Sequence, residues 1–311
     1  MCLQGHDLLS IHQLTAEQVD AIFRLAARLK DEQKRGIAHP ILKGKTLGMI
    51  FQKASTRTRV SFEVGMWQLG GSALFLSAND LQIGRGEPVK DTARVLARYV
   101  DGIMIRTFSH SEVEEMAEWS SVPVINALTD LLHPCQALTD IFTVWEQKKT
   151  LKGLKMAYVG DGNNMANALL HACAKVGMDI AIASPAAYAP NAAIVAEAKA
   201  DAAAFGSKVE ILQDPVAAVT DADVLYTDVW ASMGQESQQA ARKAVFAPYQ
   251  LNGKLLAKAK KDAIVLHCLP AHRGEEITDE VMECPQSVVF DQAENRLHVQ
   301  KAIMALTMCD K

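Results

Sequence analysis

Hydrophobic positions along the chain follow two alternating patterns. Residues 15–36 carry apolar side chains at helical spacing, and Thr15 with Gln18 forms the pattern of a capping box at the start. Gly36 is a typical helix stop, so these residues predict one amphipathic helix. Beyond it, short apolar runs that predict strands alternate with longer segments of helical periodicity.

The predicted strands fall into two series, separated by a Lys- and Gly-containing break at residues 148–153. The strands are residues 47–51, 74–76, 103–105 and 122–127, then 156–159, 180–183, 209–212, 224–227 and 264–267. Helices are predicted at residues 60–69, 89–99, 134–147, 165–176, 192–205, 239–249 and 293–308. Continuously apolar strands between helices indicate buried parallel sheets and an α/β fold. The break favours two doubly wound domains with mainly parallel sheets over one barrel.

Composition narrows the classes of function. The 311 residues are 49% hydrophobic and 22% charged, which is enough to bury a substantial core. A net charge of −4 excludes the broad positive field of a dedicated nucleic-acid binder, but not a small basic pocket. No membrane span or secretory signal is visible, and the six cysteines are scattered without a C-x-x-C pair. We therefore expect no membrane partner and a reducing, cytoplasmic location.

Polar residues collect directly after six of the predicted strands. Ligands in open α/β sheets bind beyond the carboxyl ends of the strands, so this convergence predicts a ligand site. The segments are residues 53–59, 106–107, 133–136, 160–164, 228–234 and 267–270.

Residues 55–59, with the sequence Ser-Thr-Arg-Thr-Arg, have the chemistry of an anion pocket. Hydroxyls, free amides at a helix start and Arg57 together suit a phosphate. An N-cap followed by two surface arginines is the alternative. Arg106 and His133, at neighbouring strand ends, favour the phosphate, while Arg59 lies on another side of any helix and is interpreted as structural.

Two further segments each allow a structural and a functional interpretation. His133-Pro134-Cys135-Gln136 is either a helix start with proline at its first position or a pair of groups, His133 and Gln136, that polarise an acyl group. Gly160-Asp161-Gly162 is part of a dinucleotide fingerprint. Met165 replaces its third glycine, and no acidic residue ends the next strand, so we expect no cofactor.

His267, Cys268 and His272 raise the question of a metal site or a nucleophilic thiol. Pro270 turns the chain between these residues, and no second ligand pair stands nearby, so we expect no metal. A thiolate nucleophile would need an adjacent base, which leaves Cys268 either reactive or simply buried at a strand end.

These motifs, in this order and along nearly the whole chain, resemble those of the aspartate/ornithine carbamoyltransferase family. The resemblance is carried by residues 55–59, Arg106, the His133–Gln136 segment and His267-Cys268-Leu269-Pro270. Asp228 with Ser232-Met233-Gly234 is similar to the ornithine-specific branch. Cys135 departs from the threonine that is common in relatives.

The resemblance implies transfer of a carbamoyl group from carbamoyl phosphate to the side-chain amine of L-ornithine, in arginine metabolism. It implies two α/β domains joined by two interdomain helices, in a homotrimer or a multiple of trimers with sites at subunit boundaries. Residues 1–140 with 292–311 would bind carbamoyl phosphate, and residues 141–291 would bind ornithine.

The resemblance also implies a set of site residues. Arg106, His133, Cys268 and Asp228 would be catalytic. Carbamoyl phosphate would contact Ser55, Thr56, Arg57, Thr58, Gln82, Arg106, His133, Gln136, Cys268, Leu269 and Arg296, with Gln82 completing a neighbouring subunit's pocket. Ornithine would contact Asn164, Asp228, Ser232 and Met233.

The sequence allows three alternative functions besides carbamoyl transfer to ornithine. Aspartate as acceptor would require several cationic side chains in the second domain, where Asp228 and Cys268 lie instead. A nicotinamide-dependent dehydrogenase built on the Gly160 turn would leave the Ser55–Arg59 cluster unexplained. A non-catalytic binding protein of this class is usually secreted, and no signal is visible.

Overall fold

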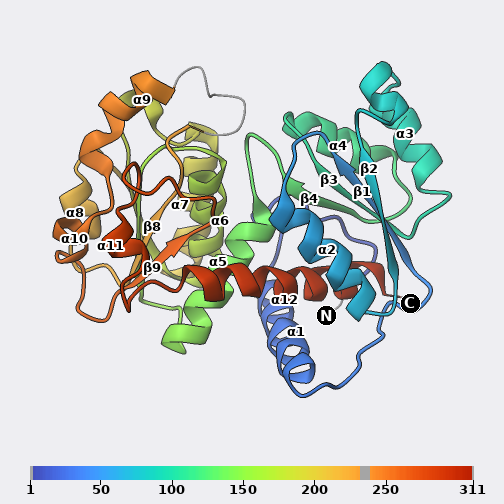
Figure 1. Ribbon diagram of the computed structural model, residues 1–311, viewed down its shortest axis with the longest axis horizontal. Coiled ribbons are helices and arrows are strands. Elements are labelled where there is room, and N and C mark those ends of the chain that lie inside the picture. The colour runs from blue at the N-terminus through green and yellow to red at the C-terminus, as the bar shows by residue number, and fades with distance from the viewer. Residues whose placement is uncertain (1–2, 232–238, 310–311) are drawn as a thin grey trace. The chain divides into compact units, whose positions relative to one another are not determined.

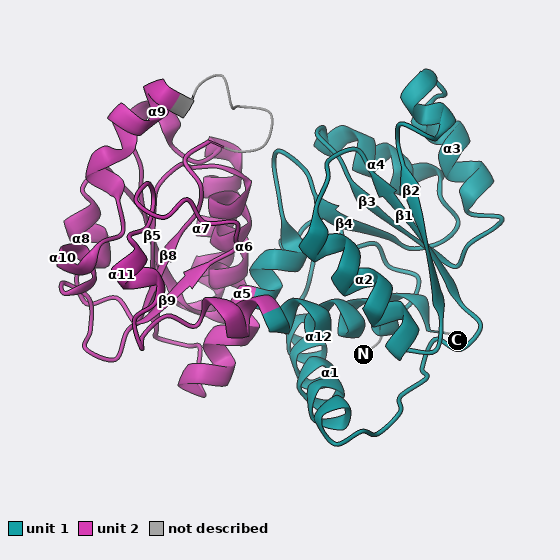
Figure 2. Cartoon of the chain, in the orientation of Figure 1, with its two compact units in different colours: residues 1–139, 294–311 teal, residues 140–293 magenta. Residues whose placement is uncertain are grey.

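The computed structural model describes residues 3–231 and 239–309 (Figure 1). The chain divides into two compact units, which Figure 2 distinguishes by colour. Unit 1 comprises Met1–Thr139 and Glu294–Lys311, and unit 2 comprises Asp140–Ala293. Each unit contains one sheet, and every strand pair in both sheets is parallel, as the apolar strands predict.

Unit 1 is built on a sheet with the strand order β2-β1-β3-β4. The strand that starts the series, β1, has β2 on one side and β3 on the other, which makes the β1/β3 boundary the switch point of a doubly wound sheet. Its elements are α1 (Ala16–Lys34), β1 (Thr46–Phe51), α2 (Thr56–Gln68), β2 (Ser72–Ser77), η1 (Gln82–Arg85), α3 (Val89–Leu96), β3 (Gly102–Arg106), α4 (His110–Trp119) and β4 (Val124–Leu128).

Unit 2 repeats this plan with the strand order β7-β6-β5-β8-β9, so its switch point lies between β5 and β8. Its elements are β5 (Lys155–Val159), α6 (Asn164–Val176), β6 (Asp179–Ala183), η2 (Ala186–Tyr188), α7 (Ala192–Phe205), β7 (Val209–Leu212), α8 (Pro215–Val219), β8 (Val224–Thr227), α9 (Gln239–Phe246), η4 (Ala247–Tyr249), α10 (Gly253–Leu256), β9 (Ile264–His267) and α11 (Asp279–Met282).

Two helices carry the chain from one unit into the other. The division falls inside α5 (Pro134–Lys148), after Thr139, and inside α12 (Val289–Met308), after Ala293. The break at residues 148–153 follows α5, and both of its sides lie in unit 2.

Local sequence signals explain most helix boundaries. The capping box at Thr15 and Gln18 forms as predicted, and Gly36 follows α1 with a φ of +70°. The sequence did not indicate α4, because only Val113 and Met116 of its ten residues are buried and the apolar stripe is too short to show a period. In residues 3–231 and 239–309, no helix combines the length and apolar character needed to cross a membrane.

In unit 1, α1 and α12 cross (Figure 1), and buried polar side chains lie where they meet, namely Lys30, Asn295, His298 and Lys301. Lys30 donates to Asn295 Oδ1 at 2.6 Å, and Lys301 donates to Gln33 Oε1 at 2.9 Å and to Gln68 Oε1 at 2.8 Å. Burial lowers the pKa of Lys301 to about 8. The same burial, together with the positive charges of Lys301 and Lys30, lowers the pKa of the neighbouring His298 to about 3.

We expect His298→Gln to make the protein less sensitive to acid. An unfolded histidine binds a proton near pH 6.5, whereas folded His298 does so only near pH 3, so the unfolded state gains protons first as the pH falls. Between pH 7 and pH 5 this histidine should cost about 2 kcal/mol of the free energy of unfolding. Urea titrations at both pH values measure the loss, with exposed His6→Gln as the control. If the free energy of unfolding falls equally from pH 7 to pH 5 in the parent and in His298→Gln, His298 is not the cause of the acid sensitivity.

Candidate active site

The loop after β1 brings the predicted anion-binding residues to the switch point of unit 1. Ser55 is the N-cap of α2, and its hydroxyl accepts a hydrogen bond from the Thr58 amide at 3.2 Å. Thr56 is exposed as the first helical residue, Arg57 is half-buried and Thr58 is buried. Hydroxyls and amides at a helix start therefore lie beside an arginine, which suits an anion.

The neighbouring strand adds a second arginine. Arg106 is the last residue of β3 and is buried, and its Nε donates to the carbonyl oxygen of Lys53 at 3.2 Å. The Lys53 ammonium is buried, pairs with Asp130 and lies 4.3 Å from the centroid of the Phe108 ring. The sequence did not indicate this pair, because Lys53 and Asp130 follow different strands.

Arg296 of α12 joins two segments that are distant in sequence. Its Nη1 donates to Gln136 Oε1 at 2.7 Å, and its Nη2 donates to Thr58 Oγ1 at 2.7 Å. Both bonds are buried. The planar guanidinium therefore fixes the side chains of Gln136 and Thr58 relative to each other.

His133 lies buried next to these arginines. Burial, followed by the charges of Arg296, Arg106 and Arg57, holds its pKa well below the usual 6.5. The ring is consequently neutral at physiological pH and carries one N–H donor. Its Nδ1 is buried and has no hydrogen-bond partner within the described part of the chain. A buried ring nitrogen of this kind is free to bind a polar ligand atom.

Three other residues of the motifs have separate environments. The Cys135 thiol is buried and donates to the Asn126 carbonyl at 3.4 Å, and burial raises its pKa to about 12, which indicates a structural role. Arg59 pairs with Glu63 at 3.1 Å and stacks on the Phe75 ring, in agreement with its interpretation as structural. Gln82 is exposed on η1, and no hydrogen bond between described residues joins it to the arginines.

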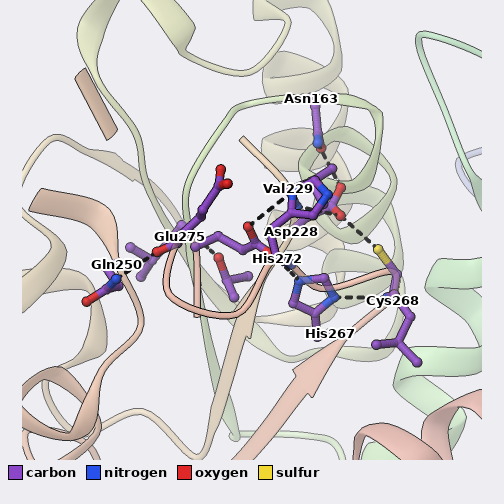
Figure 3. A network of polar contacts seen from close by, with 12 residues as sticks. Asn163, Asp228, Val229, Gln250, His267, Cys268, His272 and Glu275 are labelled. Atoms are coloured by element: carbon purple, nitrogen blue, oxygen red, sulfur yellow. Dashed lines mark hydrogen bonds and ion pairs between the residues drawn. The ribbon is translucent and has the colours of Figure 1, made fainter. Parts of the chain in front are cut away.

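In unit 2, the loops after β5 and β8 meet at Asp228 (Figure 3). Asn163 Nδ2 donates to Asp228 Oδ2 at 2.8 Å, and the Val229 amide donates to Asp228 Oδ1 at 2.8 Å. The Cys268 thiol, from the loop after β9, donates to Oδ1 at 3.0 Å. All three of these donors are neutral, and a buried carboxylate in such surroundings suits a cationic ligand.

The glycine turn after β5 is explained by packing. A Cβ at Gly162 would lie 2.3 Å from the Pro190 nitrogen and 2.5 Å from the Tyr188 carbonyl oxygen, so only glycine fits. Asn163 caps α6 by accepting hydrogen bonds from the Met165 and Ala166 amides. The resemblance to a dinucleotide fingerprint thus has a local structural cause in this turn.

Cys268 is a hydrogen-bond donor. Burial of the sulfur and the adjacent charge of Asp228 raise its pKa well above the usual value for a thiol. The thiol is therefore protonated at neutral pH, which disfavours a thiolate nucleophile and favours the hydrogen bond to Asp228.

His267 fixes the turn that carries Cys268 and Leu269. Its Nδ1 accepts the Leu269 amide at 2.9 Å, so its Nε2 carries the proton and donates to Glu276 Oε1 at 3.1 Å. Leu269 has a φ of +59°, an uncommon conformation for a non-glycine residue that marks functional turns. Asp228, His267 and Cys268 bring candidate metal ligands within 4.8 Å of one another. Both ring nitrogens of His267 are already engaged in these hydrogen bonds.

The remaining predicted ornithine contacts are only partly described. Asn164 begins α6, one residue after Asn163, and is half-buried. Ser232 and Met233 lie outside the described residues. An ion pair that the sequence did not indicate lies nearby, where Arg242 Nη1 donates to Asp161 Oδ2 at 2.7 Å. Burial raises the pKa of Asp161 to about 6 despite this pair.

Comparison with known proteins matches both halves of the chain. Residues 6–146 match the carbamoyl-P binding domain of aspartate/ornithine carbamoyltransferase, and residues 152–307 match its Asp/Orn binding domain. The ornithine carbamoyltransferase of Carboxydothermus hydrogenoformans is 58% identical over 305 residues, which cover 98% of each chain.

Solved structures are similar over the same extent. The ornithine carbamoyltransferase structure from Pyrococcus furiosus is 56% identical, has a TM-score of 0.97 and covers 99% of this chain and 98% of its own. The ornithine transcarbamoylase from Giardia lamblia is 33% identical, has a TM-score of 0.89 and covers 99% of both chains. Matches of this length and identity establish that the chain belongs to the aspartate/ornithine carbamoyltransferase family, whose members are transferases.

Proposed function

We propose that this protein transfers the carbamoyl group of carbamoyl phosphate to the side-chain amine of L-ornithine, producing L-citrulline and phosphate. Residues 1–140 with 292–311 bind carbamoyl phosphate, and residues 141–291 bind ornithine. Catalysis rests on Arg106, His133, Asp228 and Cys268. Support comes from the ornithine carbamoyltransferases of Carboxydothermus hydrogenoformans and Pyrococcus furiosus, which are 58% and 56% identical to this chain.

Unit 1 supplies the chemistry for the carbamoyl donor. Arg57 and the start of α2 hold the phosphate, and Arg106 reaches both the phosphate and the carbonyl oxygen. Neutral His133 donates an N–H to the carbonyl oxygen, which becomes negative during attack, and Gln136 holds the carbamoyl amide. The low pKa of His133 supports this role, because a neutral imidazole beside three arginines is a stable donor.

The environment of Asp228 is the observation that decides the acceptor. Among the described residues, its hydrogen-bond partners are Asn163, the Val229 amide and Cys268, and none of them is basic. The two carboxylates of aspartate would be repelled by this buried charge. A diamino acid carries two ammonium groups that this charge attracts, which favours ornithine as the acceptor.

The reaction needs the neutral form of the side-chain amine. A free alkylammonium has a pKa near 10, so one proton must leave before the nitrogen lone pair attacks the carbonyl carbon. The new C–N bond forms, the carbon–oxygen bond to phosphate breaks, and phosphate departs with the electron pair. The attacking nitrogen releases a second proton to solvent. No covalent enzyme intermediate is needed, because carbamoyl phosphate is already activated.

We propose that the chain assembles as a homotrimer or a multiple of trimers, in the cytoplasm. Support comes from exposed apolar side chains on α2 and on the sheet-edge strand β2 in unit 1, namely Val60, Trp67, Leu74 and Phe75. Trp67 alone is 76% exposed, which is unusual for a side chain with no partner surface. Gln82 is exposed at the start of η1, the element that follows β2. We propose that it completes the pocket of a neighbouring subunit.

Ornithine should be the only efficient acceptor among small amines. The purified protein is mixed with carbamoyl phosphate and with ornithine, aspartate, putrescine or acetylornithine, and carbamoylated product is measured by mass spectrometry. We expect citrulline in large excess over the other products, because only ornithine has both a free side-chain amine and an intact amino-acid end. Preferential carbamoylation of aspartate would reject the assignment.

Arg57→Ala should abolish most citrulline formation while leaving the fold intact. Loss of one preorganised donor to developing charge typically lowers kcat by about 100- to 1000-fold. The control is Arg24→Ala on α1, because Arg24 is 78% exposed and pairs only with Asp20 among the described residues. Unchanged turnover in Arg57→Ala would remove this residue from the phosphate site.

Cys268→Ala should slow turnover and weaken the use of ornithine, by roughly tenfold in kcat/KM, because the buried carboxylate of Asp228 loses a hydrogen-bond donor. Cys268→Ser keeps a donor and should retain more activity. Cys284→Ala, which removes another half-buried thiol of unit 2, is the control. Parental steady-state kinetics in Cys268→Ala would show that the thiol has no part in the reaction.

A further inference from the structure

A buried glutamine holds the backbone at the start of the Cys268 turn. Gln292 of α12 accepts the His267 amide through its Oε1 at 2.9 Å and donates from its Nε2 to Asp140 Oδ1 at 2.6 Å. The same Nε2 lies 3.4 Å from the Tyr226 hydroxyl. Gln292, Asp140 and Tyr226 are each at most 1% exposed. All of these contacts lie within unit 2.

The position of β9 explains why this backbone amide needs a side-chain partner. β9 is the edge strand next to β8, and alternate amides of a strand point to opposite sides. On the outer side, the Val265 amide donates to the Gln286 carbonyl at 2.8 Å. The next outward amide belongs to His267, and Gln292 replaces the missing strand as its acceptor.

The orientation of the Gln292 carboxamide is determined by its two partners. An N–H faces Oε1 and a carboxylate faces Nε2, so neither a carboxylate nor a flipped amide fits this place. A fully buried carboxylate such as Asp140 is costly to leave without one of its donors. The pair therefore specifies one position for the peptide that precedes Cys268.

We propose that Gln292 and Asp140 are positioning residues for the acceptor amine. By holding the His267 peptide, they set the place of Cys268 and Leu269 next to Asp228. They also connect this turn to α5 and α12, the two helices that carry the chain into unit 1. This inference rests on the proposed carbamoyl transfer to ornithine and assigns to these two residues a role in the use of the acceptor.

The test exchanges the donor and the acceptor between the two residues. Gln292→Glu places two carboxylates face to face, and we expect kcat/KM for ornithine to fall by at least about tenfold. The KM for carbamoyl phosphate should change less than the KM for ornithine, since all of its proposed ligands except Cys268 and Leu269 lie in unit 1. Asp140→Asn retains an acceptor for Gln292 Nε2 and should have a smaller effect.

The double variant Gln292→Glu/Asp140→Asn restores the complementarity in reverse. The new carboxylate accepts from both the His267 amide and the new amide at position 140, so kcat/KM for ornithine should recover to within about threefold of the parent. This recovery distinguishes a specific pair from general damage to the core, which a second buried substitution would increase.

A matched control is present on the same two helices. Gln147 of α5 donates to Asp291 of α12 at 3.3 Å, but both residues are exposed and neither contacts His267 among the described contacts. Gln147→Glu and Asp291→Asn make the same chemical changes and should leave both kinetic constants within about twofold of the parent.

Four outcomes overturn the inference. The first is a parental kcat/KM for ornithine in Gln292→Glu, and the second is no recovery in the double variant. The third is an equal change in the KM values of both substrates. The fourth is an equal effect of the control variants. All four require a parent protein that forms citrulline. A parent without this activity overturns the proposed function itself, so the two failures are distinguishable.

Discussion

Parallel strand order is the constraint on which the rest of this structure depends. In each sheet the carboxyl ends of all strands lie at one edge, and the loops diverge at the switch point, between β1 and β3 in unit 1 and between β5 and β8 in unit 2. Arg106 ends β3 in unit 1, and Asp228 directly follows β8 in unit 2. Within each unit, polar residues that are far apart in sequence are thereby brought to one edge of the sheet.

The sequence was sufficient for the strands, the two-sheet architecture and the residues at strand ends, because apolar runs and helix caps are local signals. It was not sufficient for interactions that depend on strand order. Three sets of contacts join segments that are tens to hundreds of residues apart. They are the Arg296 bonds to Thr58 and Gln136, the pairing of Lys53 with Asp130, and the Gln292 bond to the His267 amide. Asp130 and Gln292, taken alone, have the pattern of ordinary surface or helix residues.

Opposite local charges lead to the same chemical result in the two units. Around His133, burial and three arginines disfavour the imidazolium, and the ring remains a neutral donor. Around Cys268, burial and Asp228 disfavour the thiolate, and the sulfur also remains a neutral donor. A net charge of −4 contains none of this information, because it averages a cationic cluster in one unit with an anionic one in the other.

Neutral donors at fixed positions are well suited to a reaction whose donor substrate is already activated. The protein then has to orient the reactants and stabilise charge on oxygen, rather than form a covalent bond of its own. Rigid orientation requires that each donor be held from behind by groups that cannot relax. Arg296 is locked by Gln136 and Thr58, and His267 is held between Glu276, the Leu269 amide and Gln292. The buried polar contacts behind these residues are therefore as much a part of the reaction chemistry as the side chains that would touch substrate.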